Sequence, residues 1–323
     1  MVKPILTIAI PTYNRKKFLL KKLKFLKKID NLDIEIIIVQ NNSNSINLIN
    51  KDHYKKYKNI KIFNNKKNIG GNLNIIKCIE LANSEWIWIL GDDDDIHKSS
   101  IELILNDLYS NLDKDIICIN YSTSIYQHKK NQIIKNINNF FNIFNNSKRS
   151  CSNILFISAN VLKLEDLKKN IDYGYNYSES FAPHLAILLY IISKYKKYIY
   201  INEKKIIVSH DNDENLKWSR FIFAIKIIKL LKLEILINNR DDLKKFISNL
   251  ISHPLNFYFL IFENSHNKYE RRKNNILLYK AYSKINNSRY IKIIFIINYY
   301  LFNYNLIYKI LKKIRTIYKV FKY

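Results

Sequence analysis

The sequence predicts an α/β fold in which a mostly parallel sheet is covered by helices on both faces, followed by a helical C-terminal region. Between residues 5 and 121, short apolar runs alternate with segments of helical period, a pattern typical of βαβ units. The runs are almost continuously apolar, as expected for strands buried on both sides of a parallel sheet. Beyond about Trp218 the strand signal ends and long segments rich in Ile, Leu, Tyr and Lys follow.

Five apolar runs are predicted as strands: residues 5–10, 34–39, 60–63, 86–90 and 116–119. Two segments between them repeat apolar side chains with helical spacing: Leu19, Leu23 and Leu26 in the first, and Ile75, Ile76 and Ile79 in the second. These segments are predicted as helices that pack on the sheet.

The middle of the chain is less regular. Residues 131–148 are rich in Asn with interleaved Phe and Ile, which predicts either a long surface loop or a poorly ordered excursion, positioned to cover the site. Residues 154–158 are predicted as a strand, 162–169 as a short helix, 183–193 as a clear helix, and 198–209 as a strand or strand pair.

We place a domain boundary near residue 215, which separates an α/β domain (1–215) from a basic helical region (216–323). One face of the last segment is apolar: Ile307, Ile310, Leu311, Ile314, Ile317 and Phe321. Such a basic amphipathic helix fits an anionic membrane surface, and it fits packing on the domain or on a second subunit equally well. The apolar run 293–308 is too short for a membrane span.

Composition limits the possible classes of protein. A hydrophobic share of 48% excludes a disordered chain, and a net charge of +27 favours a polyanionic partner such as anionic lipid, nucleic acid or a phosphorylated substrate. The abundance of Lys, Asn and Ile is also what an AT-rich genome produces. Three Cys residues without CxxC spacing indicate a reduced compartment, and we expect a cytoplasmic protein.

Polar clusters follow the first four predicted strands, at residues 11–15, 40–43, 68–72 and 91–95. Ligands of open α/β sheets bind at the carboxyl ends of the strands. We therefore predict that the four clusters converge on one edge of the sheet and form the functional site.

The last cluster contains four consecutive carboxylates, Asp92 to Asp95. They repel one another, so a folded chain tolerates them only where a cation or hydrogen-bond donors compensate the charge. Asp92 and Asp94 can face the same site and offer the hard oxygen ligands that Mg²⁺ or Mn²⁺ prefers. A solvated acidic turn that caps the next helix is the alternative.

Residues 86–94 (WIWILGDDD) resemble the strand and DxD motif of family 2 glycosyltransferases, which have the GT-A fold. Three further segments are similar to motifs of that family in the same order: IAIPTYNR (8–15), VQNNS (39–43) and NIGGN (68–72). The resemblance is firm over residues 5–110, extends more weakly to about 210, and is absent beyond.

The resemblance implies that residues 1–110 bind a nucleotide-sugar donor and residues 111–215 serve the acceptor. The implied donor-binding residues come from the four clusters: Pro11, Thr12, Asn14, Arg15, Gln40, Asn41, Asn68, Gly70, Asn72, Asp92 and Asp93. Thr12 and Asn14 would contact the base or ribose from one side, and Gln40 and Asn41 from the other. Gln40 stands where the family usually has Asp, which bears on base preference.

The resemblance also implies an Mn²⁺ or Mg²⁺ ion held by Asp94 and Asp92. Asp94 is the first candidate for a direct ligand, and His210 is a further one. The register stays open, because the first Asp of the family motif falls where Gly91 stands. A loop position without a function is the alternative for His210. For the base that activates the acceptor, Glu179 is the first candidate and Asp172 the second; an acid at a helix N-terminus is the other interpretation of Glu179.

The predicted function is a metal-dependent inverting glycosyltransferase of the hexosyltransferase type. It moves a sugar from a nucleotide-diphosphate-sugar, a UDP-sugar in our prediction, to a hydroxyl of a bacterial surface glycan: lipooligosaccharide, O-antigen, capsule or lipid-linked oligosaccharide. We expect it to be peripheral on the inner face of the cytoplasmic membrane, attached through the basic C-terminal helices.

The alternative is a polyanion or nucleic-acid binding protein with an α/β fold and no transferase activity. Its support is the charge of +27 alone, and no nucleic-acid recognition motif accompanies that charge, so we expect no nucleic-acid partner. A nucleotidyltransferase would need a Gly-rich, Arg-containing phosphate loop after the first strand, which is missing.

Overall fold

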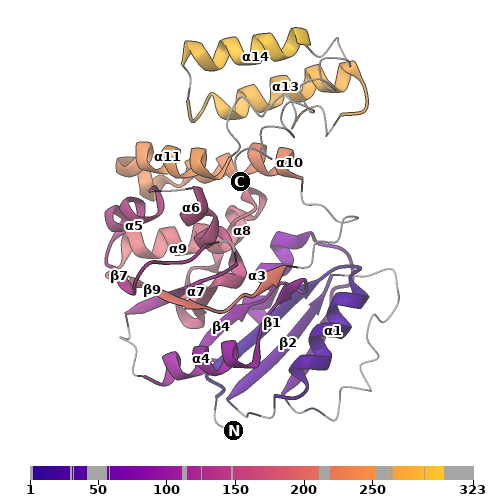
Figure 1. Ribbon diagram of the computed structural model, residues 1–323, viewed down its shortest axis with the longest axis vertical. Helices are drawn as coiled ribbons and strands as arrows, with labels where there is room; N and C mark the ends of the chain where they lie inside the picture. The colour runs from indigo at the N-terminus through magenta and orange to yellow at the C-terminus, as the bar shows by residue number, and fades with distance from the viewer. Residues whose placement is uncertain are drawn as a thin grey trace, which may run out of the picture.

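The computed structural model describes residues 3–29, 31, 33–41, 57, 59–110, 115–124, 126–146, 148–210, 219–251, 261, 265–286 and 288–301. The described chain forms three tiers along its long axis (Figure 1). A sheet with helices on both faces lies at the N-terminal end, a layer of shorter helices follows, and the pair α13 and α14 lies at the far end.

The sheet has eight strands in the order β3-β2-β1-β4-β8-β6-β9-β7. The first four in the chain are mutually parallel: β1 (Leu6–Thr12), β2 (Ile34–Gln40), β3 (Ile60–Asn64) and β4 (Trp86–Ile89). The other four are β6 (Ile116–Ser122), β7 (Gln132–Ile134), β8 (Asn160–Lys163) and β9 (Tyr198–Lys205). β8 runs antiparallel to β4 and β6, whereas β6 and β9 are parallel. The predicted mostly parallel sheet is confirmed.

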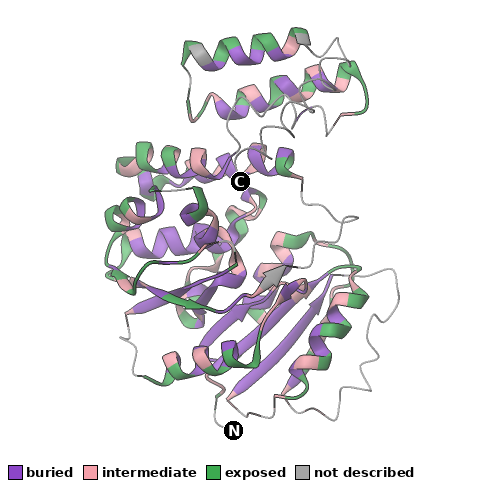
Figure 2. Ribbon diagram, viewed as in Figure 1, coloured by how far each residue is buried: buried purple, intermediate pink, exposed green. Residues whose placement is uncertain are grey.

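Helices cover both faces of the sheet. Neighbouring residues of a strand point to opposite faces, so each strand contributes apolar side chains to both. In β1, Ile8 and Ile10 pack in one apolar core with the helices α1 (Lys16–Leu26) and α4 (Lys98–Tyr109). Ala9 between them belongs to a second core, which holds the helices on the other face: α3 (Gly71–Leu81), α7 (Leu164–Lys169) and α9 (Pro183–Lys194). The inner strands β1, β2 and β4 are buried almost throughout (Figure 2).

The predicted surface loop at residues 131–148 is wrong. The segment forms β7 and the helix α5 (Ile137–Phe144), whose N-cap side chain, Asn136, accepts a hydrogen bond from the N–H of Asn139 at 2.9 Å. Phe140 and Phe141 are buried against Phe246, with ring centroids 5.6 and 6.2 Å away. The Asn residues occupy the cap and the outer face, so they do not prevent a helix.

The predicted strand at residues 154–158 is also wrong. A helix, α6 (Lys148–Leu155), and a 3₁₀ turn, η1 (Ile157–Ala159), occupy this segment, and the strand β8 begins only at Asn160. Cys151 and Ile154 are buried three residues apart on one helical face. The short helix, the clear helix and the strand pair predicted beyond this point appear as α7, α9 and β9 with β10 (Ser209–His210).

Short helical elements continue the second core beyond residue 219. They are α10 (Arg220–Lys226), η4 (Ile227–Lys232), η5 (Glu234–Asn239), α11 (Arg240–Leu250), α13 (Lys268–Tyr282) and α14 (Arg289–Leu301). Leu236 and Phe246 share one apolar cluster with α9, so the layer of α10 and α11 is packed on the sheet domain. The predicted amphipathic helix at 307–321 lies outside the described residues, and none of the described helices is long and apolar enough to cross a membrane.

Candidate functional site

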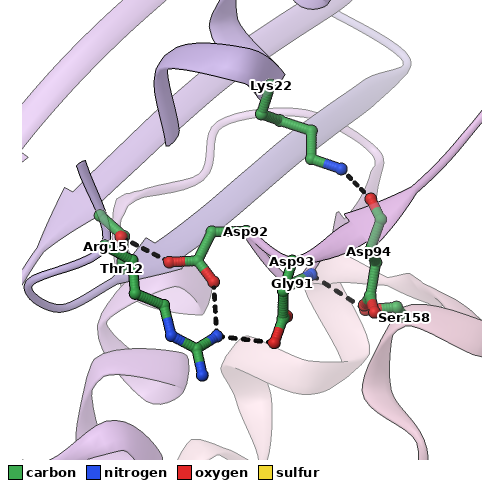
Figure 3. A network of polar contacts seen from close by, with 8 residues as sticks. All are labelled: Thr12, Arg15, Lys22, Gly91, Asp92, Asp93, Asp94 and Ser158. Carbon is green, nitrogen blue, oxygen red and sulfur yellow. Dashed lines mark hydrogen bonds and ion pairs between the residues drawn. The ribbon is translucent and has the colours of Figure 1, made fainter. Parts of the chain in front are cut away.

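The acidic run leaves β4 at the carboxyl edge of the sheet, where β1 also ends (Figure 3). The Arg15 guanidinium lies between two carboxylates, with Nη1 at 2.9 Å from Asp92 Oδ1 and 2.7 Å from Asp93 Oδ2. The hydroxyl of Thr12 donates to Asp92 Oδ2 at 2.6 Å. Two residues of the first cluster therefore compensate the first half of the acidic run.

The second half of the run is held from other elements. The Ser158 hydroxyl donates to Asp94 Oδ2 at 2.5 Å and accepts the N–H of Gly91 at 2.9 Å. The Lys22 ammonium of α1 donates to the backbone carbonyl oxygen of Asp94 (Figure 3), and Asp95 pairs with the exposed Lys21. Hydrogen-bond donors and cations of the chain itself offset the mutual repulsion of the four carboxylates.

Burial differs sharply along the run. Asp92 is 5% exposed and Asp94 is 2% exposed, whereas the side chain of Asp93 is 31% exposed. Burial raises the pKa of Asp92, and the contacts with Thr12 and Arg15 only partly oppose this. Burial also lowers the pKa of Lys22.

Gly91 is closely surrounded by side chains of the acidic run. A Cβ atom at this position would lie 2.5 Å from Asp94 Oδ2 and 3.1 Å from Asp93 Oδ1. A side chain at this position would have to displace the Asp94 carboxylate from Ser158, which glycine avoids.

The second and third clusters are tied together by Asn41, which is buried. Its Nδ2 donates to Asn68 Oδ1 at 2.7 Å, and its Oδ1 accepts the N–H of Ile69 at 2.9 Å. Gly70 follows with a φ of 86°, which favours glycine, and the helix α3 begins one residue later. Asn41 and Asn68 thus shape the turn before α3.

Gln40 differs from its neighbour. Its side chain is buried, and its amide nitrogen Nε2 has no hydrogen-bond partner among the described residues. Buried polar groups are rarely left unpaired. A ligand acceptor atom at this edge of the sheet would satisfy that donor.

The turn that carries the candidate base, Glu179, is joined to the third cluster by a hydrogen bond. Asn72 Nδ2 donates to the carbonyl oxygen of Ser178 at 2.6 Å, and Ser178 begins the 3₁₀ turn η2 (Ser178–Ser180), which carries Glu179. The side chain of Glu179 is 66% exposed and pairs with Lys229 of η4. Asp172 is also exposed, in the first turn of α8 (Ile171–Asn176), and no such link joins it to the edge.

The remaining predicted residues lie around this edge. Pro11 is next to last in β1, and Asn14 adopts the left-handed conformation, with a φ of 54°, in the turn before α1. The backbone of His210 pairs with that of Asp94 through the short strands β10 and β5 (Asp94–Asp95). Within the described side chains, no group of three or more His, Cys, Asp or Glu residues is arranged to hold a metal ion.

Two residues at this edge were missed in the sequence. Ser158 stands 64 positions after the carboxylate that it binds, and no local pattern marks it. Lys22 had a signal, because it shares the helical face of Leu19, Leu23 and Leu26, all buried in α1. A charged residue on an apolar face indicates a buried polar partner.

The fold and the edge of strand-end clusters define a glycosyltransferase with the GT-A fold. Residues 7–162 match the model of Glycosyl transferase family 2, so this part of the chain is a family 2 glycosyltransferase domain.

Relatives agree with this assignment. Abequosyltransferase RfbV of Salmonella typhimurium is 34% identical over 113 residues, an alignment that spans 34% of this chain and 34% of that protein. An uncharacterized glycosyltransferase of Methanocaldococcus jannaschii is 24% identical over 285 residues, 87% of this chain and 86% of the other. The crystal structure of S. aureus TarS 1-349 superposes with a TM-score of 0.62 at 15% identity, covering 92% of this chain and 90% of that one.

Proposed function

We propose that the protein is a metal-dependent, inverting glycosyltransferase that moves a sugar from a nucleotide-diphosphate-sugar to a hydroxyl of a bacterial surface glycan. The observation that carries this proposal is the convergence of four strand-end clusters on one sheet edge, with an acidic run, a paired Arg15 and an unpaired amide of Gln40. RfbV is named an abequosyltransferase, and TarS 1-349 has been solved with UDP-GlcNAc. Both are consistent with a nucleotide-sugar donor.

In this proposal the nucleotide lies over the ends of β1 and β2. The unpaired Nε2 of Gln40 donates to a carbonyl oxygen of the base, and Asn14 lies on the other side. Thr12 and Asn41 are already engaged, with Asp92 and with the turn before α3. They therefore shape the site more than they contact the ligand. A UDP-sugar remains our preferred donor.

The surroundings of the acidic run favour Asp93 over Asp94 as the direct metal ligand. A ligand must present an accessible oxygen, and Asp93 is the most exposed of the three residues Asp92, Asp93 and Asp94. Asp94 and Asp92 would hold the turn in shape, and His210 stays a candidate through its backbone pairing with Asp94. When bound, Mn²⁺ or Mg²⁺ would neutralise the charge that develops on the departing diphosphate.

The acceptor hydroxyl needs a base, and we assign this role to Glu179. Its carboxylate takes the hydroxyl proton while the oxygen attacks the anomeric carbon and the bond to the diphosphate breaks, which inverts the configuration. Lys229, which pairs with Glu179, orients this carboxylate. Asp172 is the second candidate.

The test is a panel of nucleotide-sugars offered to the purified full chain, with released nucleotide as the readout. We expect turnover of one donor with Mn²⁺ or Mg²⁺ that EDTA removes and re-added metal restores. Turnover that is unchanged in EDTA would overturn the metal dependence. Tight, salt-sensitive nucleic-acid binding together with no binding of any nucleotide-sugar would favour the alternative, a polyanion binding protein.

A further inference from the structure

A cavity of about 580 Å³ lies between the sheet domain and the helices α10 and α11. Its walls are mostly apolar, and they include Leu155, Phe156, Phe181, Phe223 and Leu250. The wall residue Phe181 adopts the left-handed conformation with a φ of 65°. It is fixed there by Phe223 and by the ammonium of Lys226, which lies 5.6 Å from the ring centroid.

The cavity adjoins the site through three of its wall residues. Ile157 directly precedes Ser158, the residue that binds Asp94. Phe181 follows the turn η2 that carries Glu179. Ile75 belongs to α3, one turn after the residue that holds η2 in place. The cavity therefore borders the segments that carry Ser158 and Glu179.

Two cations line the same cavity, Lys148 and Arg220. Both residues line the cavity while remaining exposed to solvent, and partial burial together with the positive charge of Arg220 lowers the pKa of Lys148. Neither forms an ion pair with an acidic side chain of the described chain. Within the described residues, the Lys148 ammonium donates a long hydrogen bond, 3.5 Å to the Ile251 carbonyl oxygen.

A third titratable residue of the wall adds no charge. The pKa of His184 is lowered to about 4 by burial, and its Nε2 lies 3.0 Å from the carbonyl oxygen of Leu155. His184 is neutral at physiological pH. The cavity thus combines apolar walls with a positive charge that comes from Lys148 and Arg220.

We propose that this cavity is the acceptor site and that the acceptor sugar is carried on a phosphate attached to an apolar chain. The proposal rests on the transferase function above. Arg220 and Lys148 bind the phosphate, because charge-assisted hydrogen bonds to phosphate are strong and relieve the repulsion between the two cations. The apolar walls take the first part of the chain, and the sugar then extends toward Glu179.

The test uses calorimetric titration of the full chain with farnesyl phosphate, with farnesol and inorganic phosphate as separate probes. We expect farnesyl phosphate to bind at least about tenfold more tightly than either partial probe. Arg220→Gln and Lys148→Gln should each weaken its binding by about tenfold. Arg149→Gln is the matched control, because it removes one positive charge from an exposed neighbouring position of α6 that does not line the cavity.

UDP binding, measured on the same proteins, separates the two proposals. If the unmodified chain binds no nucleotide or nucleotide-sugar, the transferase function fails. If it binds UDP but not farnesyl phosphate, or if Arg220→Gln and Lys148→Gln bind farnesyl phosphate as tightly as Arg149→Gln does, the acceptor site is overturned. Equal affinity for inorganic phosphate and farnesyl phosphate would overturn the apolar chain and point to a phosphate within a soluble glycan.

Discussion

Three adjacent carboxylates at the sheet edge have three different surroundings. Asp92 is buried between Thr12 and Arg15, Asp93 shares Arg15 but remains accessible, and Asp94 is buried on Ser158. A carboxylate that is buried and fully engaged serves the shape of the turn, whereas an accessible one can bind a ligand. Sequence position alone does not distinguish these roles, since all three are Asp.

We expect Asp93→Asn to lower donor turnover by roughly 100-fold or more and to raise the Mn²⁺ concentration needed for half-maximal activity. Asp94→Asn should instead reduce the free energy of unfolding by about 1–3 kcal/mol, because it disturbs a buried hydrogen bond. Metal titration of activity and urea unfolding measure the two effects. Asp241→Asn, an exposed acid on α11, is the control. Loss of the metal response in Asp94→Asn alone would return the ligand role to Asp94.

Glu179→Gln should lower kcat by roughly 10²- to 10⁴-fold, as expected for the loss of a general base. The KM for the donor should hardly change, because Glu179 serves the acceptor. Asp172→Asn, a comparable change on the neighbouring helix α8, should leave kcat within a few-fold. If Asp172→Asn is the inactive variant, the two candidates exchange roles. Steady-state kinetics with the donor and acceptor varied separately decides the matter.

At the scale of elements, polar links join strands and helices at both ends of the sheet. At the site end, Asn41 joins β2 to the turn before α3. At the opposite end the buried Glu35 of β2 accepts hydrogen bonds from Thr7 of β1, Lys61 of β3 and the N–H of Asn83. A buried carboxylate with several donors therefore joins three parallel strands.

Glu35 should make stability depend on pH. Burial by itself would raise its pKa, but the hydrogen bonds from Lys61, Thr7 and Asn83 outweigh burial and place the pKa below its ordinary value. A lowered pKa means that the ionised group stabilises the fold above the pKa of the unfolded chain, and that this contribution is lost as the pH falls through the folded pKa.

We therefore expect Glu35→Gln to lower the free energy of unfolding by about 1–2 kcal/mol at pH 7 and by much less near pH 3. Urea unfolding at a series of pH values measures the difference. Glu203→Gln changes an exposed carboxylate of β9 and should have little effect at any pH. A difference between Glu35→Gln and the unmodified chain that stays constant down to pH 3 would show that the ionised form of Glu35 contributes nothing.

At the scale of the whole molecule, α13 and α14 form an outer tier beyond α10 and α11 (Figure 1). Three side chains on one face of α14 are apolar and at least half exposed: Ile293, Ile296 and Ile297, at 53%, 56% and 50%. The chain as a whole carries a charge of +27. An exposed apolar stripe in a basic protein suits an anionic membrane surface, and we propose this helix as one contact point.

The triple variant Ile293→Ser, Ile296→Ser and Ile297→Ser should bind vesicles of anionic lipid at least about tenfold more weakly, since each exposed apolar side chain contributes on the order of 1 kcal/mol at an interface. Ile237→Ser removes an apolar side chain of η5 that is 67% exposed and serves as the control. Co-sedimentation measures the bound fraction. Equal binding of the triple variant would place the membrane contact elsewhere in the chain.

The parallel part of the sheet and the edge that carries the candidate site can be predicted from the amino-acid pattern alone. Apolar runs and helical spacing are local patterns, and parallel strands bring their carboxyl ends together whatever the loops do. Thr12, Gln40, Asn68 and Asp92 could therefore be placed near one another from their positions after the strands. The spacing of the Phe residues in α5 also indicates a buried helical face, although the many Asn residues led to the prediction of a loop.

The surroundings of the individual residues at that edge could not be predicted, because they depend on contacts between segments far apart in the chain. Ser158 reaches Asp94 across 64 positions, and Asn72 reaches Ser178 across 106. Neither contact can be recognised from a short sequence motif. These contacts bury Asp94, leave Asp93 accessible and hold the turn that carries Glu179. The position of the candidate site thus follows from the carboxyl ends of the strands. The roles of its individual residues depend on which side chains are brought together by packing.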